Sequence, residues 1–152
     1  MRRTEKEISE RSALEAVIAA AQVCRVAMCD EDRPYVVPMC FGYAEGTFYL
    51  HCALEGRKID VLRRNANVCL EMEDAVAAKP GKTACDWGMD YRSVLAFGRA
   101  ETVDDPAERR RALDLIMARY APAGAYDYPD GMLRRTLVLK VRAEQMTGKR
   151  SG

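Results

Sequence analysis

The chain has 152 residues, of which 49% are apolar and 31% are charged, a balance that fits one soluble globular domain over residues 1–152. The formal net charge of +1 gives no electrostatic reason to expect a nucleic-acid or membrane partner. No apolar run approaches the roughly 20 residues that span a bilayer, and the charged residues 1–12 lack the hydrophobic region of a signal peptide. We therefore expect a cytoplasmic protein.

Hydrophobic periodicity and turn residues predict short strands that alternate with a few helices. An apolar stripe from Leu14 to Ala21 marks the first helix, and Ser12 with Glu15 forms a capping-box pattern at its start. In chain order we expect a helix over 12–22, strands over 23–29, 35–43 and 47–52, a helix over 56–64, strands over 68–72 and 91–103, a helix over 105–120, and a last strand over 136–141 that continues towards Met146.

The connections between these elements favour hairpins. Residues 44–46 (Ala-Glu-Gly) predict a tight turn, and Gly98 inside a strand predicts a bulge or bend. Residues 74–90 and 121–131 lack a clean period and are expected to contain long loops, while the tail 148–152 is expected to be frayed. Strands in hairpin order favour an antiparallel barrel over a doubly wound parallel sheet.

Cysteine usage argues for a reducing compartment. No two cysteines have C-x-x-C spacing, and the single histidine cannot complete a zinc site at the usual spacing, so no metal site is predicted. Five of the six cysteines lie in apolar, strand-like runs, where we expect reduced thiols that act as small buried hydrophobes. A catalytic thiol is considered only at Cys52 or Cys85, which lie beside polar motifs. The six are Cys24, Cys29, Cys40, Cys52, Cys69 and Cys85.

Pro38 lies inside the strand expected over 35–43. Proline cannot donate a hydrogen bond to a ladder, so within a strand it marks an edge or a place where something other than a strand lies alongside. Two interpretations are open. Pro38 either belongs to an ordinary edge strand, or a flat ligand packs against the backbone of residues 38–40.

The segment YLHCALEGRK (49–58) brings together a strand end, a glycine and a basic pair at a helix start. Free amides at a helix N-terminus and the cations of Arg57 and Lys58 would make an anion site, with phosphate as the natural guest. Many helices begin with Gly-Arg-Lys, so the spacing also fits a solvated helix start. His51 is the only histidine. We favour a structural role or a role as hydrogen-bond donor for it over a role as general base.

A third polar segment is CDWGMDYRSV (85–94), which holds the only tryptophan and an Arg-Ser pair that enters a strand. Trp87 near Arg92 and Ser93 would stack on a ring while the polar pair binds a phosphate. Trp87 would equally seal the mouth of a barrel. The arginine clusters at 109–111 and 134–135 are interpreted as solvated faces.

Together these segments resemble a known family. Nearly the whole chain is similar, in order, to the FMN-binding split barrels of the pyridoxamine 5′-phosphate oxidase-like family, and in particular to the branch of 5-nitroimidazole resistance reductases. The stretches that carry the resemblance are CRVA at 24–27, RPYVVPMCFGY at 33–43, YLHCALEGRK at 49–58, CDWGMDYRSV at 85–94 and MTGK at 146–149.

The resemblance implies a homodimer with two FMN sites at the subunit interface. Relatives often carry serine or glycine after the histidine, and the larger, softer Cys52 would alter the phosphate contacts and weaken FMN binding. By this likeness the flavin ring would lie against Val37, Pro38 and Met39, the phosphate near His51, Cys52, Arg57 and Lys58, and Trp87, Tyr91, Arg92 and Ser93 of the same or the partner chain would complete the site.

The function implied by the resemblance is an NAD(P)H-dependent reductase of small electron-poor acceptors, such as nitroimidazoles, other nitroaromatics or quinones, with the flavin as electron carrier. Three alternatives remain. The chain would be a non-catalytic FMN- or haem-binding module, a deazaflavin-dependent reductase, or a pyridoxamine 5′-phosphate oxidase proper. Haem binding usually needs an axial histidine, and only His51 is present. The last alternative lacks support because the expected basic C-terminal substrate segment is missing.

Overall fold

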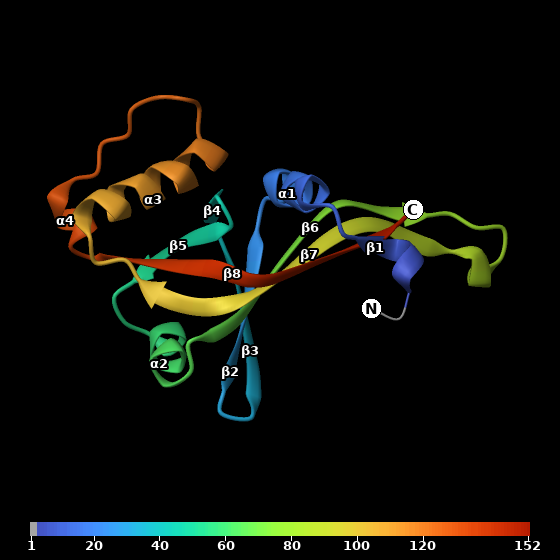
Figure 1. Ribbon diagram of the computed structural model, residues 1–152, viewed down its shortest axis with the longest axis horizontal. Helices are drawn as coiled ribbons and strands as arrows, with labels where there is room; N and C mark the ends of the chain where they lie inside the picture. The colour runs from blue at the N-terminus through green and yellow to red at the C-terminus, as the bar shows by residue number, and fades with distance from the viewer. Residues whose placement is uncertain (1–2) are drawn as a thin grey trace.

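The computed structural model describes residues 3–152, whose backbone forms one curved sheet flanked by helices (Figure 1). No helix within this range is long and apolar enough to cross a membrane. The helices are α1 (Arg11–Ala20), α2 (Arg57–Arg64), α3 (Pro106–Tyr120) and α4 (Asp130–Leu133), with two 3-10 turns, η1 (Thr4–Lys6) and η2 (Ala84–Asp86). The strands are β1 (Glu7–Ile8), β2 (Cys24–Asp30), β3 (Arg33–Met39), β4 (Phe41–Ala44), β5 (Thr47–Ala53), β6 (Asn67–Lys79), β7 (Gly88–Thr102) and β8 (Thr136–Ser151).

Antiparallel pairing joins the eight strands of the described residues in the order β3-β2-β6-β7-β8-β5-β4, with β1 added beside β8. Strands β3 and β4 form the two ends of this path, yet only Cys40 separates them in the chain. The sheet therefore curls so that its two ends approach each other at Cys40, and since β3 and β4 do not pair, the barrel is split there. This confirms the predicted mainly β fold, an antiparallel split barrel with flanking helices, and it places Pro38 on an edge strand.

The core lies inside the curled sheet and beneath α1. Helix α1 buries Leu14, Val17 and Ile18 against strands β6, β7 and β8, as the predicted apolar stripe requires. Phe41 and Phe48 have 0% exposed surface at the centre of the same cluster. Helix α3 packs on β4 and β5 and forms a smaller apolar cluster of its own, so the two helices cover different parts of the sheet (Figure 1).

The predicted helix starts have different outcomes. Asp105 caps α3 by accepting a hydrogen bond of 2.7 Å from the Glu108 amide, with Pro106 in the first turn, as the sequence indicates. The capping box at α1 is wrong, because the N-cap is Glu10 and no side chain caps the helix. Glu15 instead accepts hydrogen bonds from Arg11 at 2.8 Å and from the Tyr43 hydroxyl at 3.0 Å. The hydroxyl of Tyr43, on strand β4, therefore binds the carboxylate that the capping-box pattern predicts to bind the backbone.

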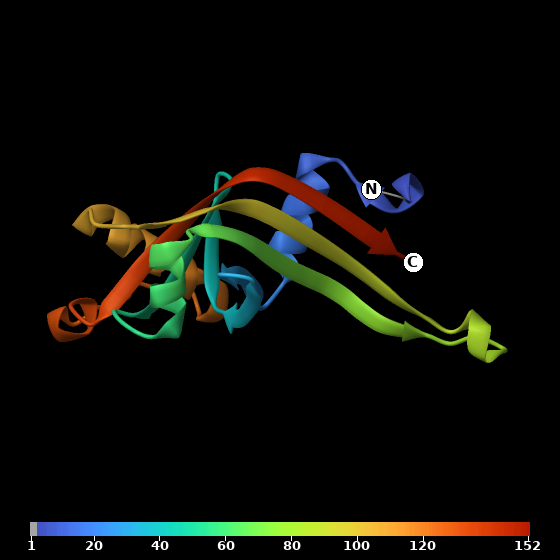
Figure 2. The same ribbon diagram turned by 90° about the horizontal axis from the view of Figure 1, so that it is seen from below.

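Strands extend into two segments for which the sequence predicts a long loop or a frayed end. Within residues 74–90 the predicted loop is limited to residues 80–87, which include η2. Strands β6 and β7 occupy the rest and form an extended hairpin, here called the β6–β7 arm (residues 74–92), whose last paired residues are Lys79 and Gly88. The arm projects past the end of β8 (Figure 2). The tail is not frayed, since β8 pairs with β7 as far as Ser151 and with β1 at Gly148.

The cysteines are all free thiols, but the expectation that they belong to the core holds only for Cys24. Burial raises the pKa of Cys24 to about 12. Cys29, Cys40 and Cys85 are exposed, and the other two are half-buried. For the strand residues Cys29, Cys52 and Cys69, alternation explains this result, because successive side chains of one apolar run point to opposite faces of the sheet. Cys40 and Cys85 lie outside the strands, between β3 and β4 and in η2.

Gly98 marks the bulge that the sequence predicts, at the register shift between Phe97 and Gly98 in the β7–β8 ladder. A Cβ atom there would lie 2.3 Å from the Arg142 carbonyl oxygen and 3.0 Å from Val141 Cγ1. We expect Gly98→Ala to lower the free energy of unfolding by about 1–3 kcal/mol, measured by urea denaturation. Gly124→Ala, with nothing within 4 Å of the added atom, is the control and should change it by less than about 0.5 kcal/mol. Equal changes in the free energy of unfolding for Gly98→Ala and Gly124→Ala would show that crowding at Gly98 is relieved by backbone movement.

Candidate functional site

An open cleft of about 660 Å³ lies where the ends of β3 and β5 approach the start of α2 and helix α4. Strand β5 pairs with β8 from Thr47 to Ala53, and this ladder sets the last residues of β5 beside the first residues of β8. The lining is Pro38, Met39, Cys40, His51, Cys52, Ala53, Lys58, Met132, Arg135 and Thr136.

The start of α2 offers unpaired donors on this side of the molecule. Gly56 has φ of 122°, a conformation that suits glycine, and its carbonyl accepts hydrogen bonds from the amides of Ile59 and Asp60. The amides of Arg57 and Lys58 have no acceptor within residues 3–152, as expected for the first turn of a helix. These amides carry the partial positive charge of the helix N-terminus, so an anion is stabilised there.

Lys58 is the cation that lines the cleft from α2. Its Nζ atom lies 3.4 Å from the sulfur of Met39 and has no carboxylate partner in the described part of the chain. A thioether is a weak acceptor, so the ammonium keeps most of its capacity for a stronger, negatively charged partner. Lys58 is therefore available for an anionic ligand.

The environment of the cleft shifts the pKa values of His51 and Cys52 on β5. Partial burial lowers the pKa of His51, and the nearby Lys58 ammonium lowers it further. The imidazole is therefore mainly neutral at pH 7, one ring nitrogen donating and the other accepting. Burial raises the pKa of the Cys52 thiol, against an opposing effect of Lys58. The thiolate that would act as a nucleophile is thus scarce at neutral pH.

Arg57, the other half of the predicted basic pair, has different partners. Its guanidinium donates to Asp30 at 3.3 Å and lies 4.5 Å from the centre of the Tyr35 ring, and it does not line the cleft. Asp30 also binds Arg64 from the end of α2. Arg57 thus ties α2 to the β2–β3 hairpin, while Lys58 alone of the pair lines the cleft.

The second cation in the cleft is Arg135, for which the arginine pair at 134–135 predicts a solvated face. Arg135 follows α4, directly before β8, and it has no carboxylate partner among residues 3–152. The register pairs Ala53 with Thr136, so Arg135 lies at the strand end that also carries His51. Knowledge that the last strand pairs with residues 47–53 would have brought Arg135 into the predicted site.

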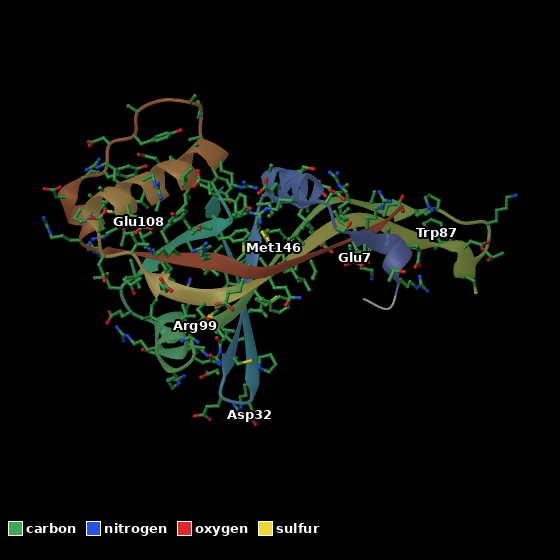
Figure 3. All side chains as sticks on the ribbon, viewed as in Figure 1. Glu7, Asp32, Trp87, Arg99, Glu108 and Met146 are labelled. Carbon is green, nitrogen blue, oxygen red and sulfur yellow. The ribbon has the colours of Figure 1, made fainter. Side chains whose placement is uncertain are left out.

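The remaining predicted residues are divided between two places. Val37, on β3, packs against the core and leaves the cleft wall to its neighbours Pro38 and Met39. Trp87, Tyr91, Arg92 and Ser93 lie on or beside the arm, outside the cleft lining of the same chain. Figure 3 shows Trp87 at the opposite end of the molecule from α3.

The charge of Arg92 is paired within the arm. Arg92 makes a bidentate ion pair with Asp74 of β6, in which Nε donates a hydrogen bond of 3.0 Å. Trp87 is 57% exposed. A single chain therefore brings together the Met39, His51 and Lys58 part of the predicted site, and separates it from the Trp87 and Arg92 part.

The lining of the cleft combines cationic donors with apolar surface, a combination that fits FMN. Lys58 and Arg135 provide charge and hydrogen bonds for a phosphate, the free amides of α2 belong to Lys58 and the residue before it, and Pro38 with Met39 and Met132 provides apolar surface for a ring system. The arrangement can thus hold a molecule that is anionic at one end and apolar and flat at the other.

Comparison with solved structures shows the same fold in a proposed antibiotic resistance protein and in two flavin proteins. A proposed 5-nitroimidazole antibiotic resistance protein from Bacteroides thetaiotaomicron is 38% identical, with a TM-score of 0.85 over 95% of this chain and 86% of that chain. A flavocytochrome from Azotobacter vinelandii is 19% identical, with a TM-score of 0.87 over 100% of this chain and 72% of that one. An FAD- and haem-binding protein from Mycobacterium smegmatis is 20% identical, with a TM-score of 0.86 over 96% of this chain and 73% of that one.

Sequence comparison gives the family. An uncharacterised protein of Rhizobium meliloti (strain 1021) is 29% identical over 153 aligned positions, which cover 93% of each chain. The family model described as pyridoxamine 5′-phosphate oxidase matches residues 10–150, almost the full length of the chain. The chain therefore belongs to the pyridoxamine 5′-phosphate oxidase family.

Proposed function

We propose that this protein binds FMN in the cleft and acts as an NAD(P)H-dependent reductase of small electron-poor acceptors of the nitroimidazole, nitroaromatic or quinone type. The observation that carries the proposal is the unpaired Lys58 ammonium beside the two free amides of α2, next to an apolar wall of Pro38 and Met39. The 38% identical relative named for 5-nitroimidazole resistance supports the acceptor class.

The protein's own contribution is binding and orientation. FMN supplies the redox chemistry when it is bound, taking electrons from NAD(P)H and passing them to the acceptor. Lys58 and Arg135 would hold its phosphate, because both lack a carboxylate partner within residues 3–152 and both line the cleft. His51, neutral at pH 7 because its pKa is lowered, would donate or accept one hydrogen bond without adding charge.

We propose further that two copies of the chain form the working unit. The convex face of β2, β6 and β7 carries an apolar row of Ala27, Cys69 and Phe97, aligned by the strand register, with Leu95 beside it. Leu95 and Phe97 are 37% and 41% exposed. An exposed apolar row of this kind is typical of an interface. A partner's arm would then supply the Trp87 and Arg92 part of the site that one chain leaves separate.

Native mass spectrometry of the purified protein tests the proposal directly. The expected result is a dimer with two bound FMN molecules and a yellow solution, and added NAD(P)H should then reduce a nitroaromatic or quinone in steady state. Bound FMN without turnover would favour a non-catalytic module. A red-brown protein with a Soret band would identify haem, with His51 as its sole available imidazole, and a deazaflavin would be recognised by its mass.

The thiol chemistry of the cleft gives a separate prediction. We expect Cys52→Ser to keep the turnover of the FMN-loaded protein within a few-fold of the wild type, because the flavin carries the electrons and the raised pKa of Cys52 disfavours the thiolate. FMN should bind more tightly, since a hydroxyl is a better hydrogen-bond donor to phosphate than a thiol. The measurement is steady-state NAD(P)H oxidation with a quinone acceptor. A variant that keeps FMN and loses activity by orders of magnitude would establish a thiol step. None of the other five cysteines is expected to be essential.

A further inference from the structure

A second cavity, of about 460 Å³, adjoins the cleft beneath the loop that follows α3. One wall is the face of α3 with Leu113, Ile116 and Met117, and the cover is the loop of residues 125–129. Three residues, His51, Met132 and Thr136, line both the cavity and the cleft. The two spaces are thus neighbours that share a wall containing the only histidine of the chain.

The cavity offers apolar surface and few free polar groups. The Tyr128 hydroxyl donates to Asp114 at 2.8 Å, and the Tyr126 hydroxyl donates to the Pro122 carbonyl at 2.6 Å. The Thr136 hydroxyl donates to the Met132 carbonyl at 2.9 Å. These three hydroxyl protons are engaged by the protein. The aromatic rings, aliphatic side chains and methionines are left to contact a ligand.

The linings of the cavity and the cleft differ in charge. Lys58 and Arg135 line the cleft only, and among residues 3–152 no lysine or arginine lines the cavity. Its single carboxylate is that of Asp127, an exposed residue of the covering loop. An anionic ligand such as FMN or NAD(P)H meets Lys58 and Arg135 in the lining of the cleft. Two arginines near the cavity are outside its lining: Arg109 donates to the carbonyls of Leu133 and Thr136, and Arg110 lies 5.7 Å from the centre of the Tyr128 ring. An uncharged apolar ligand can be desolvated in the cavity at little electrostatic cost.

We propose that this cavity is the binding site for the electron acceptor and that it selects uncharged compounds of one or two aromatic rings. The volume lies at the lower end of the roughly 300–1,000 Å³ found for small-molecule pockets. The neutral His51 imidazole at the shared wall provides a hydrogen bond to a polar substituent such as a nitro or carbonyl oxygen. The assignment of the ligand as an electron acceptor rests on the proposed function, whereas the cavity's preference for uncharged rings rests on its lining alone.

The experiment uses the single histidine as a built-in probe. The full-length protein is labelled with 13C-histidine, so one ring signal reports on the wall between the two spaces. Nitrobenzene and 4-nitrobenzoate are titrated into the protein with FMN and without it. Ala125→Trp fills the cavity from its cover, and Ala123→Trp places the same side chain on an exposed residue of the same loop outside the lining. Flavin fluorescence gives the FMN affinity of every variant independently.

We expect nitrobenzene to shift the His51 signal saturably in the wild type and in Ala123→Trp. Its dissociation constant should rise about tenfold or more in Ala125→Trp, because the indole occupies the ligand's space. 4-Nitrobenzoate should bind about tenfold or more weakly than nitrobenzene, and FMN affinity should be equal in all three proteins. Equal nitrobenzene affinity in the two tryptophan variants, or equal affinity for the two probes, would overturn the assignment. Failure of the wild type to bind FMN would instead contradict the proposed function, and the titrations without FMN would still decide the cavity.

Discussion

Replacing Lys58 by alanine is expected to weaken FMN binding about ten- to a hundredfold and to leave riboflavin binding unchanged. The ammonium lines the cleft, lies 3.4 Å from a thioether and lacks a carboxylate partner within residues 3–152. A hydrogen bond to a charged group is worth roughly 1.5–3 kcal/mol, which converts to this change in affinity. Riboflavin has the same ring and chain without the phosphate. The measurement is the dissociation constant of each ligand by flavin fluorescence.

Arg57→Ala is the matched control, one residue away on the same helix. Its guanidinium is bound to Asp30 and stacked on Tyr35, so its removal should leave FMN affinity within about threefold while loosening the β2–β3 hairpin. If Lys58→Ala reduced the affinities for FMN and riboflavin equally, the result would show that Lys58 supports the fold. A loss of FMN affinity greater than this in Arg57→Ala would show that the Arg57 guanidinium leaves Asp30 and binds the phosphate.

Phe97→Asp is expected to dissociate the proposed dimer and to lower FMN affinity with it. Phe97 is 41% exposed in the apolar row of the convex face, beside Cys69 of the neighbouring strand. An unpaired carboxylate buried in an interface costs several kcal/mol, so the dimer dissociation constant should rise by about a hundredfold or more. FMN affinity should fall because the partner's Trp87 and Arg92 no longer complete the site. Light scattering gives the mass, and flavin fluorescence gives the affinity.

Val23→Asp is the control for this substitution, since Val23 is 39% exposed, precedes β2 and is not one of the paired residues that form the apolar row. It should remain a dimer with unchanged FMN affinity. A Phe97→Asp monomer that binds FMN as tightly as the wild type would place the complete site within one chain. A Phe97→Asp dimer would show that the interface uses another face.

Local patterns predict those elements whose sequence signal is itself local. The apolar stripe from Leu14 to Ile18 gives α1, and the Asp105-Pro106 start gives α3. The Glu45-Gly46 turn gives the β4–β5 hairpin, where both residues have positive φ, and Gly98 gives the bulge. In each case the side-chain period or the backbone conformation of a few neighbouring residues decides the structure.

The arm escapes prediction because its strands have no buried face. Residues 75–79 at the end of β6 are exposed on both sides, so there is no alternation to detect, and alanine has low strand propensity. A bulge after Asp74, where Ala75 has φ of 52°, shifts the register as well. Pairing with β7 alone makes this segment a strand. The tail is similar, since Gly148 to Ser151 is ordered by its neighbours β1 and β7.

The sequence by itself determined the barrel, the strand ends that carry Pro38 and His51, and the basic helix start that carries Lys58. Residue type and turn chemistry over a few positions are enough for the strand ends and the helix start, whereas the barrel follows from the hairpin order of the strands and from the family resemblance. Only the tertiary structure decided which cations are free, because that depends on distant partners. Asp30, from another hairpin, takes Arg57 out of the cleft, and the β5–β8 ladder brings in Arg135 from more than eighty residues away in the chain. The same long-range packing of α3 and its loop creates the apolar cavity behind His51, which no local pattern records.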